Sequence, residues 1–373
     1  MLRSSTGSQV VPGDRGAVDG LRSVAALDAV HCPVDALLGR FMDARIADLA
    51  ALDPALAPIG REVAGLVRAS GKRLRPAFVY WGHRATGAEH LEGVLGPAGA
   101  VELLHTFALI HDDVMDRSAE RRGRPAVHEA LARTHFDEGL TGDARWFGMG
   151  GAILAGDLAF VWADQLLDTA SLPPETIERA RRVFTQLRVE VMAGQYLDLR
   201  LTGREAAGEG ESLRVALLKS GRYTVTRPLQ LGAAIGGGEP TLDATLREYG
   251  DATGLAFQLR DDVLGLFGDH TVTGKGALSD LREGKRTVLM LRALSTARPP
   301  QRQVLVGALG NAELDDETAD RVREIVTDCG ALDAVEALVA EQLEVARAAL
   351  GPLGPPAREA LEELADFAAH RTV

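Results

Sequence analysis

Three aspartates at the end of an apolar stretch are the first residues whose types and spacing suggest chemistry. The segment "LLHTFALIHDDVMD" begins at Leu103 and ends with Asp112, Asp113 and Asp116. In a helix, residues i and i+4 lie on one face roughly 6 Å apart, so Asp112 and Asp116 could share a hard cation with Asp113 beside them. Mg²⁺ prefers a few carboxylates together with water and substrate phosphates. The alternative is an exposed, solvated helix end, and this motif alone does not decide between the two.

A second acidic cluster changes the balance. The segment "FQLRDDVLGLFGD" places Asp261, Asp262 and Asp269 after another apolar helical run. Metal and cofactor sites in helical bundles are built from side chains on facing helices. Acidic groups that faced each other in a core without a cation would be very unfavourable. The two clusters together therefore favour a metal site over two solvent-exposed helix ends.

The basic residues indicate an anion-binding site near these carboxylates. Only four of the 41 basic residues are lysines, and we expect those four to stand where a compact ammonium group is needed. Carboxylates, arginines and lysines together are typical of a diphosphate held partly through Mg²⁺ and partly by direct ion pairs. Two separate basic groups suggest two phosphorylated substrates. The basic candidates are Lys72, Arg75, Arg121, Arg122, Lys219, Lys275 and Lys285.

Composition and charge exclude several classes of function. The net charge of −12 argues against a nucleic-acid partner, which needs a basic surface. We find no apolar run long enough for a transmembrane segment and no signal-peptide core at the N-terminus. The two cysteines, Cys32 and Cys329, predict no disulfide framework and favour a reducing, cytoplasmic compartment. His105 and His111 lack the spacing of a zinc site.

The elements that must position these residues have a helical pattern almost throughout. The 373 residues are 46% hydrophobic and rich in Ala and Leu, which favours helices over sheets. Residues 1–24 are rich in Gly, Ser and charge, so we expect a disordered extension. From there to residue 373, apolar residues recur at three- and four-residue spacing, and no strand–helix alternation is visible. We predict one all-α domain over residues 25–373.

Seven ordered motifs give the chain a strong resemblance to a known family, the trans-isoprenyl diphosphate synthases or polyprenyl synthetases. The resemblance covers roughly residues 35–373. Its motifs are "GKRLRP", "HDDVMDRSAERRGRPAVH", "AILAGDLA", "GQYLDL", "KSGRYT", "FQLRDDVLGLFGD" and "TGKGALSDLREGKRT".

The resemblance implies a helical bundle around a deep apolar cavity, two or three Mg²⁺ ions and a homodimer. It implies that isopentenyl diphosphate attacks an ionised allylic diphosphate head-to-tail. By the same resemblance, the predicted metal ligands are Asp112, Asp113, Asp116, Asp261 and Asp262, and the allylic diphosphate site comprises Arg121, Lys219, Gln258, Lys275 and Lys285. The isopentenyl diphosphate site comprises Lys72, Arg75, His105 and Arg122, and Asp112, Asp116, Lys219, Asp261 and Lys275 are the catalytic set.

Three departures concern the second site. Lys219 is followed by Ser220 and Gly221 where the family often has Thr and a small residue. The spacing from Lys275 to Asp280 is one residue longer than in some members. The second acidic motif reads DDVLG without a third acid.

The product length is predicted from the residues before the first acidic motif. Phe107 lies five positions before Asp112, and Ala108 lies four before it. A bulky residue followed by a small one resembles geranylgeranyl diphosphate synthases, which predicts a twenty-carbon product. Phe107 as ordinary core packing is the alternative. Farnesyl or longer-chain synthesis, a class I terpene cyclase and a non-catalytic partner subunit are the competing functions.

Overall fold

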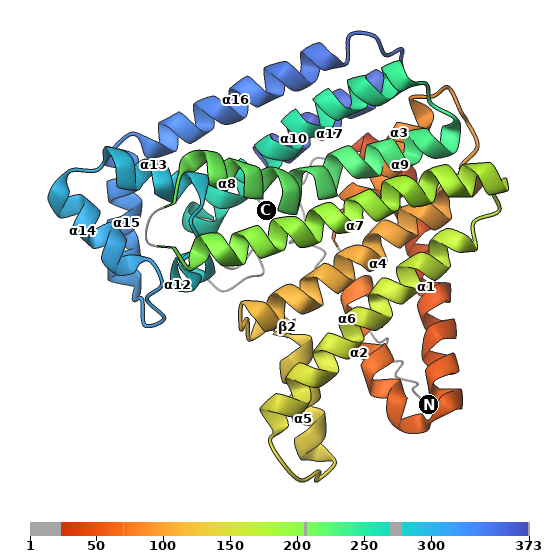
Figure 1. Ribbon diagram of the computed structural model, residues 1–373, viewed down its shortest axis with the longest axis horizontal. Helices are drawn as coiled ribbons and strands as arrows, with labels where there is room; N and C mark the ends of the chain where they lie inside the picture. Colours follow the sequence, from red (N-terminus) through yellow and green to blue (C-terminus); the bar gives the residue numbers. More distant parts are fainter. Residues whose placement is uncertain (1–23, 70, 205–206, 269–277, 372–373) are drawn as a thin grey trace, which may run out of the picture.

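The computed structural model describes residues 24–69, 71–204, 207–268 and 278–371, and this part of the chain is almost entirely helical (Figure 1). The predicted N-terminal extension lies, up to residue 23, outside the described residues. The first helices are α1 (Ala25–Leu52), the short 3₁₀ helix η1 (Pro54–Leu56), α2 (Ala57–Arg68), α3 (Leu74–Arg84), α4 (Glu92–Met115), α5 (Val127–Asp137), α6 (Ala144–Asp168) and α7 (Pro174–Thr202). They are followed by α8 (Glu209–Val215), η2 (Ala216–Thr226), α9 (Arg227–Gly236), α10 (Pro240–Phe267), α12 (Ser279–Glu283), α13 (Val288–Thr296), α14 (Pro299–Ala308), α15 (Asp316–Asp328), α16 (Ala331–Ala349) and α17 (Ala357–His370).

The predicted all-α fold is confirmed. In the described part of the chain, the only strands are β1 (Glu120–Arg121) and β2 (Arg124–Pro125), an antiparallel pair just after α4. Helix α4 packs along α6, and α10 packs on η2 and α16. In Figure 1, α10, α16 and α17 form one long edge, and α5 projects at the opposite end beside α2.

Local sequence explains where several helices begin. Pro174 and Pro240 stand at the first positions of α7 and α10, where the missing N–H of proline is not needed. Asp143 caps α6 by accepting hydrogen bonds from the backbone N–H of Arg145 at 2.9 Å and of Trp146 at 3.3 Å. These local signals determine where α6, α7 and α10 begin.

The segment around Lys219 is a π-helix, η2, where we expected an ordinary α-helix. Such segments are rare and often occur at functional sites. Two close backbone approaches accompany it. A Cβ on Gly194 of α7 would stand 2.4 Å from the backbone nitrogen of Lys219, and one on Gly254 of α10 would stand 2.6 Å from Cα of Gly221. Glycine therefore lets α7 and α10 close on both sides of η2.

Among the described residues, two helices are long and apolar enough to cross a membrane by length and composition, although we expected none. They are Gly93–Met115 within α4 and Ala144–Asp168, which is α6. In α4, 61% of the most apolar window is buried inside the protein, and in α6 it is 39%. Core helices pass the same test, and α4 lies in the core of this bundle.

Candidate active site

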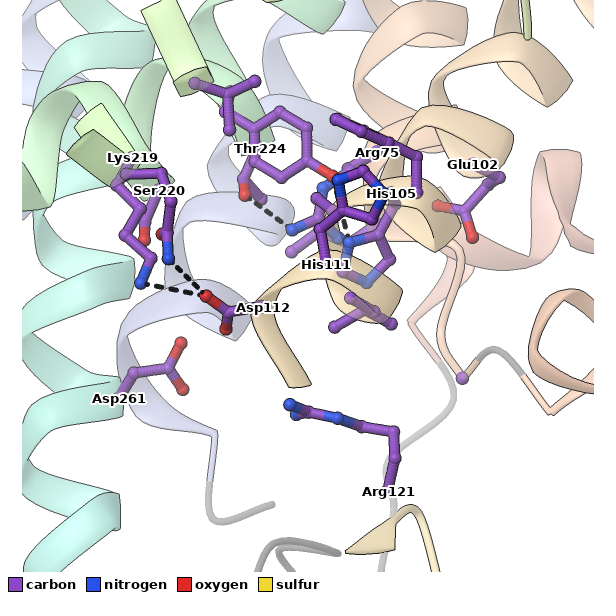
Figure 2. A pocket seen from close by; sticks show the side chains of 18 of the residues that line it. Arg75, Glu102, His105, His111, Asp112, Arg121, Lys219, Ser220, Thr224 and Asp261 are labelled. Atoms are coloured by element: carbon purple, nitrogen blue, oxygen red, sulfur yellow. Dashed lines mark hydrogen bonds and ion pairs between the residues drawn. The ribbon is translucent and has the colours of Figure 1, made fainter. Parts of the chain in front are cut away.

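A cavity of about 1390 Å³ opens between α3, α4, α7, η2, α10 and α17. It gathers side chains that are far apart in the sequence (Figure 2). A smaller adjoining cavity of about 410 Å³ contains Asp262 and Lys285. Lys275 and Asp269 lie outside the described residues. The predicted residues that line the large cavity are Lys72, Arg75, His105, Phe107, Ala108, Asp112, Arg121, Arg122, Lys219, Gln258 and Asp261.

Asp112 lies at the centre of the acidic side of the cavity and faces Asp261 across it (Figure 2). Its Oδ1 accepts a hydrogen bond from Gln195 Nε2 at 2.8 Å and lies 3.4 Å from Lys219 Nζ. Lys219 Nζ also pairs with Asp198 at 2.7 Å. Burial would lower the pKa of Lys219, but Asp112 and Asp198 outweigh it and raise that pKa. The lysine is therefore a fixed positive charge between two helices.

The other two aspartates of the first motif have different surroundings. Asp113 is buried, and its Oδ1 accepts a hydrogen bond from Arg121 Nε at 2.9 Å. Asp116 lies 3.2 Å from Lys285 Nζ, which also pairs with Asp280 at 3.3 Å and with Glu283 at 2.6 Å.

Burial disfavours the charged forms of Arg121 and Lys285, but the neighbouring carboxylates favour these forms more strongly. The hydrogen bond and the charge of Asp113 raise the pKa of Arg121 despite its desolvation. Asp280, Asp116 and Glu283 together raise the pKa of Lys285 well above its ordinary value. Both side chains therefore remain charged, and each fixes one aspartate of the first motif.

The second motif meets the C-terminal end of α17. Asp261 forms an ion pair with Arg371, whose guanidinium carbon also lies 3.8 Å from the centre of the Phe257 ring. Asp262 is buried and accepts a hydrogen bond from Gln258 Nε2 at 2.8 Å. Burial raises the pKa of Asp262 to about 8, so its carboxyl is neutral at neutral pH. Asp261 is thus the member of this pair that lines the large cavity.

The acidic side chains fit a hard divalent cation. Within the described residues, no three Asp, Glu, His or Cys side chains are gathered into a metal-binding group. Asp112, Asp116 and Asp261 pair instead with Lys219, Lys285 and Arg371. Mg²⁺ needs only one or two carboxylates when water and substrate phosphates complete its octahedron. Asp112 and Asp261, which line the open cavity, meet that requirement.

A second basic group lies on the α3 side of the cavity. The Arg75 guanidinium stacks on the Tyr223 ring at 4.6 Å and donates to Thr224 Oγ1 at 2.9 Å. His105 Nδ1 lies 3.0 Å from the Tyr223 hydroxyl. Desolvation, and then the charge of Arg75, lower the pKa of His105 well below its usual range, so this imidazole is neutral.

Buried arginine atoms in this group point to an anionic ligand. In the part of the chain that the structure describes, Arg75 Nε and Arg122 Nη1 are buried without a hydrogen-bond partner. Burial lowers the pKa of Arg122, and burial followed by the charge of Arg371 lowers that of Lys72. A diphosphate would supply acceptors to the unpaired atoms and relieve the repulsion among these cations.

Arg73 holds the loop that presents Lys72 and Arg75. Its φ of 52° is in the left-handed region, and its side chain is buried. The guanidinium pairs with Asp35 at 2.6 Å and with Glu102 at 2.8 Å. The loop is therefore anchored to α1 and α4 from behind.

Phe107 and Ala108 of α4, the predicted chain-length residues, line the cavity. The Phe107 ring centre lies 5.0 Å from that of Phe160 on α6 and 4.7 Å from that of His111. The Phe107 ring therefore packs against α6 and against the next turn of α4.

Several side chains of the candidate site were not predicted. Gln195 and Asp198 belong to the quoted motif "GQYLDL", and their spacing of three on a helix is the signal that could have identified them. Tyr223 and Thr224 follow Lys219 in "KSGRYT". Arg371 has no local signal, because only the packing of α17 brings it to Asp261.

The comparison with known proteins decides the family. The model of the family described as polyprenyl synthetase matches residues 59–328, more than half of the chain. The chain belongs to the polyprenyl synthetase family. The geranylgeranyl diphosphate synthase of Methanosarcina mazei is 34% identical over 303 residues, which cover 81% of this chain and 86% of that protein. The geranylfarnesyl diphosphate synthase of Aeropyrum pernix is 32% identical over 313 residues, which cover 82% and 92%.

A solved structure extends this polyprenyl synthetase likeness to three dimensions. The geranylgeranyl pyrophosphate synthase of Corynebacterium glutamicum, complexed with isoprenyl diphosphate and magnesium, has a TM-score of 0.88 and 35% identity. The match covers 94% of this chain and 100% of that one. This chain is thus a prenyltransferase, and its family implies isopentenyl and allylic diphosphates as substrates and a divalent metal as cofactor.

Proposed function

We propose that this prenyltransferase makes geranylgeranyl diphosphate, with Mg²⁺ as its metal. The observation that supports the proposal is one cavity with three chemically distinct parts. Its acidic side contains Asp112 and Asp261, and its basic side contains Arg75 and Arg122. Its apolar end stops at Phe107. Two diphosphates and one hydrocarbon chain fit these parts in the order that head-to-tail condensation needs.

Asp112, Asp116 and Asp261 would hold two or three Mg²⁺ ions, which would neutralise the allylic diphosphate and favour its departure. Breaking the allylic C–O bond builds negative charge on that diphosphate. Lys219 is already fixed beside Asp112, so it stabilises this charge without reorganising in the transition state. The apolar walls exclude water from the allylic cation.

The second substrate would bind on the basic side. Lys72, Arg75 and Arg122 would grip the diphosphate of isopentenyl diphosphate and aim its double bond at the allylic carbon. His105 is neutral there and adds a hydrogen-bonding group rather than a further charge. Proton loss from the new chain needs no protein base, because the released diphosphate can accept the proton.

The test supplies Mg²⁺, isopentenyl diphosphate and, in turn, dimethylallyl, geranyl or farnesyl diphosphate. The products are dephosphorylated and sized by chromatography. A twenty-carbon alcohol from each starter is expected, and Asp112→Ala should abolish turnover. A fifteen-carbon or longer principal product would contradict the proposed length. Cyclic hydrocarbons formed without isopentenyl diphosphate would indicate a terpene cyclase, and full activity of Asp112→Ala would refute the metal assignment.

We also propose a homodimer in the cytoplasm. Large apolar side chains are exposed two turns apart on α6 and α7, and include Leu154 and Val161 at 59%, Val189 at 61% and Tyr196 at 63%. Apolar faces of this kind usually bind another protein surface, and a two-fold dimer would cover the same face of both copies. Both cysteines are free thiols, which suits a reducing compartment. Light scattering should give twice the chain mass, and a monomer would contradict the dimer.

A further inference from the structure

The π-helix η2 turns residues that are five apart in the sequence toward one side. A π-helix joins residues i and i+5 by hydrogen bonds, whereas in an α-helix residues three and four apart share a face. Lys219 and Thr224 are five apart, and both line the large cavity. Lys219 pairs there with Asp112, and Thr224 accepts a hydrogen bond from Arg75 (Figure 2). The π-helical geometry therefore presents one residue to the acidic side of the cavity and one to the basic side.

A second pair of residues five apart shares one carboxylate of α7. Arg227, the first residue of α9, donates from Nη2 to Glu190 Oε1 at 2.6 Å and from Nε to Glu190 Oε2 at 2.8 Å. Arg222 Nη1 lies 3.6 Å from the same Oε1. The side chains of Glu190 and Arg227 are only 14% and 8% exposed, so solvent ions screen this contact little. An α-helical geometry would turn the two arginines to different faces, so the shared carboxylate favours the π-helix.

Asp251 of α10 also holds Arg222. Arg222 Nη2 donates to Asp251 Oδ2 at 2.8 Å, and Thr226 Oγ1 donates to Asp251 Oδ1 at 2.7 Å. The hydrogen bond and charge of Asp251, and then the charge of Glu190, raise the pKa of Arg222 although burial would lower it. Arg222 is therefore a fixed cation that ties η2 to both α7 and α10.

We propose that Glu190 is a positioning residue for catalysis. By pairing with Arg222 and Arg227, it holds η2 in the π-helical geometry that turns Lys219 and Thr224 to the cavity. Glu190 itself is not among the described residues that line the two adjoining cavities, so it acts through η2 and not on the substrates. The inference rests on the proposed function, in which Lys219 stabilises the departing diphosphate and the basic side binds isopentenyl diphosphate. Loss of the π-helical geometry would therefore impair both roles at once.

The first test is steady-state kinetics of Glu190→Gln, which keeps the size of the side chain and removes its charge. We expect kcat to fall and KM for isopentenyl diphosphate to rise, each by about tenfold, because Lys219 and Thr224 are displaced together. Glu178→Gln is the matched control, since Glu178 also belongs to α7 but pairs with Arg182 of the same helix at 2.7 Å. It should keep both constants. A Glu190→Gln enzyme that loses thermal stability but keeps the native kcat and KM would refute the positioning role.

The second test asks whether Glu190 acts on KM through Thr224. Thr224→Val removes the acceptor of the Arg75 hydrogen bond, so KM for isopentenyl diphosphate should rise. Adding Glu190→Gln to Thr224→Val should then raise KM further by less than about twofold, while kcat still falls. Two effects on KM that multiply in full would contradict the inference. If Thr224→Val alone leaves KM unchanged, the proposed isopentenyl diphosphate site fails at this residue; the kcat of Glu190→Gln then decides the inference, and an unchanged kcat would overturn it.

Arg222→Met keeps the inference testable if Glu190→Gln does not fold. The Arg222 side chain is 26% exposed, and Arg227 keeps its pair with Glu190 in this variant. The same fall in kcat and the same rise in KM are expected. A folded Arg222→Met enzyme with native values of both constants would overturn the inference.

Discussion

The close approach of α7 to η2 predicts that Gly194→Ala impairs catalysis although no residue that touches substrate is changed. A Cβ at this position would stand 2.4 Å from the backbone nitrogen of Lys219, whereas ordinary contacts begin near 3.4 Å. The neighbour is backbone and not the end of a flexible side chain, so α7 and η2 must separate by about 1 Å. Lys219 Nζ, now 3.4 Å from Asp112 and 2.7 Å from Asp198, would move with η2.

Two effects follow from that displacement. Overpacking of this kind costs about 1–3 kcal/mol of stability. A misplacement of about 1 Å in a group that stabilises the transition state can cost about 100-fold in rate. We therefore expect kcat to fall by about that factor. KM for isopentenyl diphosphate should rise as well, because Tyr223 and Thr224, which contact Arg75 and His105 of its proposed site, also belong to η2.

The assay is steady-state kinetics for both substrates, together with urea unfolding. Gly39→Ala is the control, because Gly39 is also within a helix and a Cβ there meets nothing within 4 Å. That variant should keep full activity and gain up to about 1 kcal/mol from helix propensity. A folded Gly194→Ala enzyme with kcat within twofold of the native value would refute the reasoning.

Two further predictions concern His105 and Arg371. The unfolded chain binds a proton on His105 as pH falls through about 6.5, whereas the folded protein does not, because desolvation and Arg75 depress that pKa. The free energy of unfolding should therefore decrease below about pH 6.5 by up to about 1.4 kcal/mol per pH unit. In urea titrations at several pH values, His105→Gln should flatten this slope. His370 is exposed, so His370→Gln should leave the slope unchanged. Equal slopes in the native protein and both variants would contradict the prediction. Arg371→Met removes the cation that pairs with Asp261, so half-maximal activity should need up to about fivefold less Mg²⁺; an increased requirement would be the contrary result.

Much of the fold could be predicted from local sequence. Apolar periodicity and helix-starting prolines such as Pro174 and Pro240 indicated the long helices, and these signals act within a few residues. The π-helix around Lys219 could not be predicted in this way. Its backbone packs against Gly194 and, through Gly221, against Gly254, and those contacts depend on how three helices meet.

The site was partly predictable for a similar reason. Helical spacing put Asp112 and Asp116 on one face, and the prediction that both are metal ligands remains to be tested. The pairing of Asp113 with Arg121 depends on the turn after α4, which local periodicity does not describe. The neutral carboxyl of Asp262 results from burial, which only the packed structure determines.

The sequence by itself determined the helical class, the two acidic motifs, the lysines beside them and the family to which they belong. All of these depend on the spacing of residues that are close in the chain, and in a helix that spacing determines which side chains share a face. The tertiary structure alone decided which charges meet: Lys219 with Asp112, Lys285 with Asp116, and Arg371 with Asp261. It also placed Arg222 and Arg227 beside Glu190. These contacts join helices that are distant in the chain, and their geometry follows from packing the whole core at once.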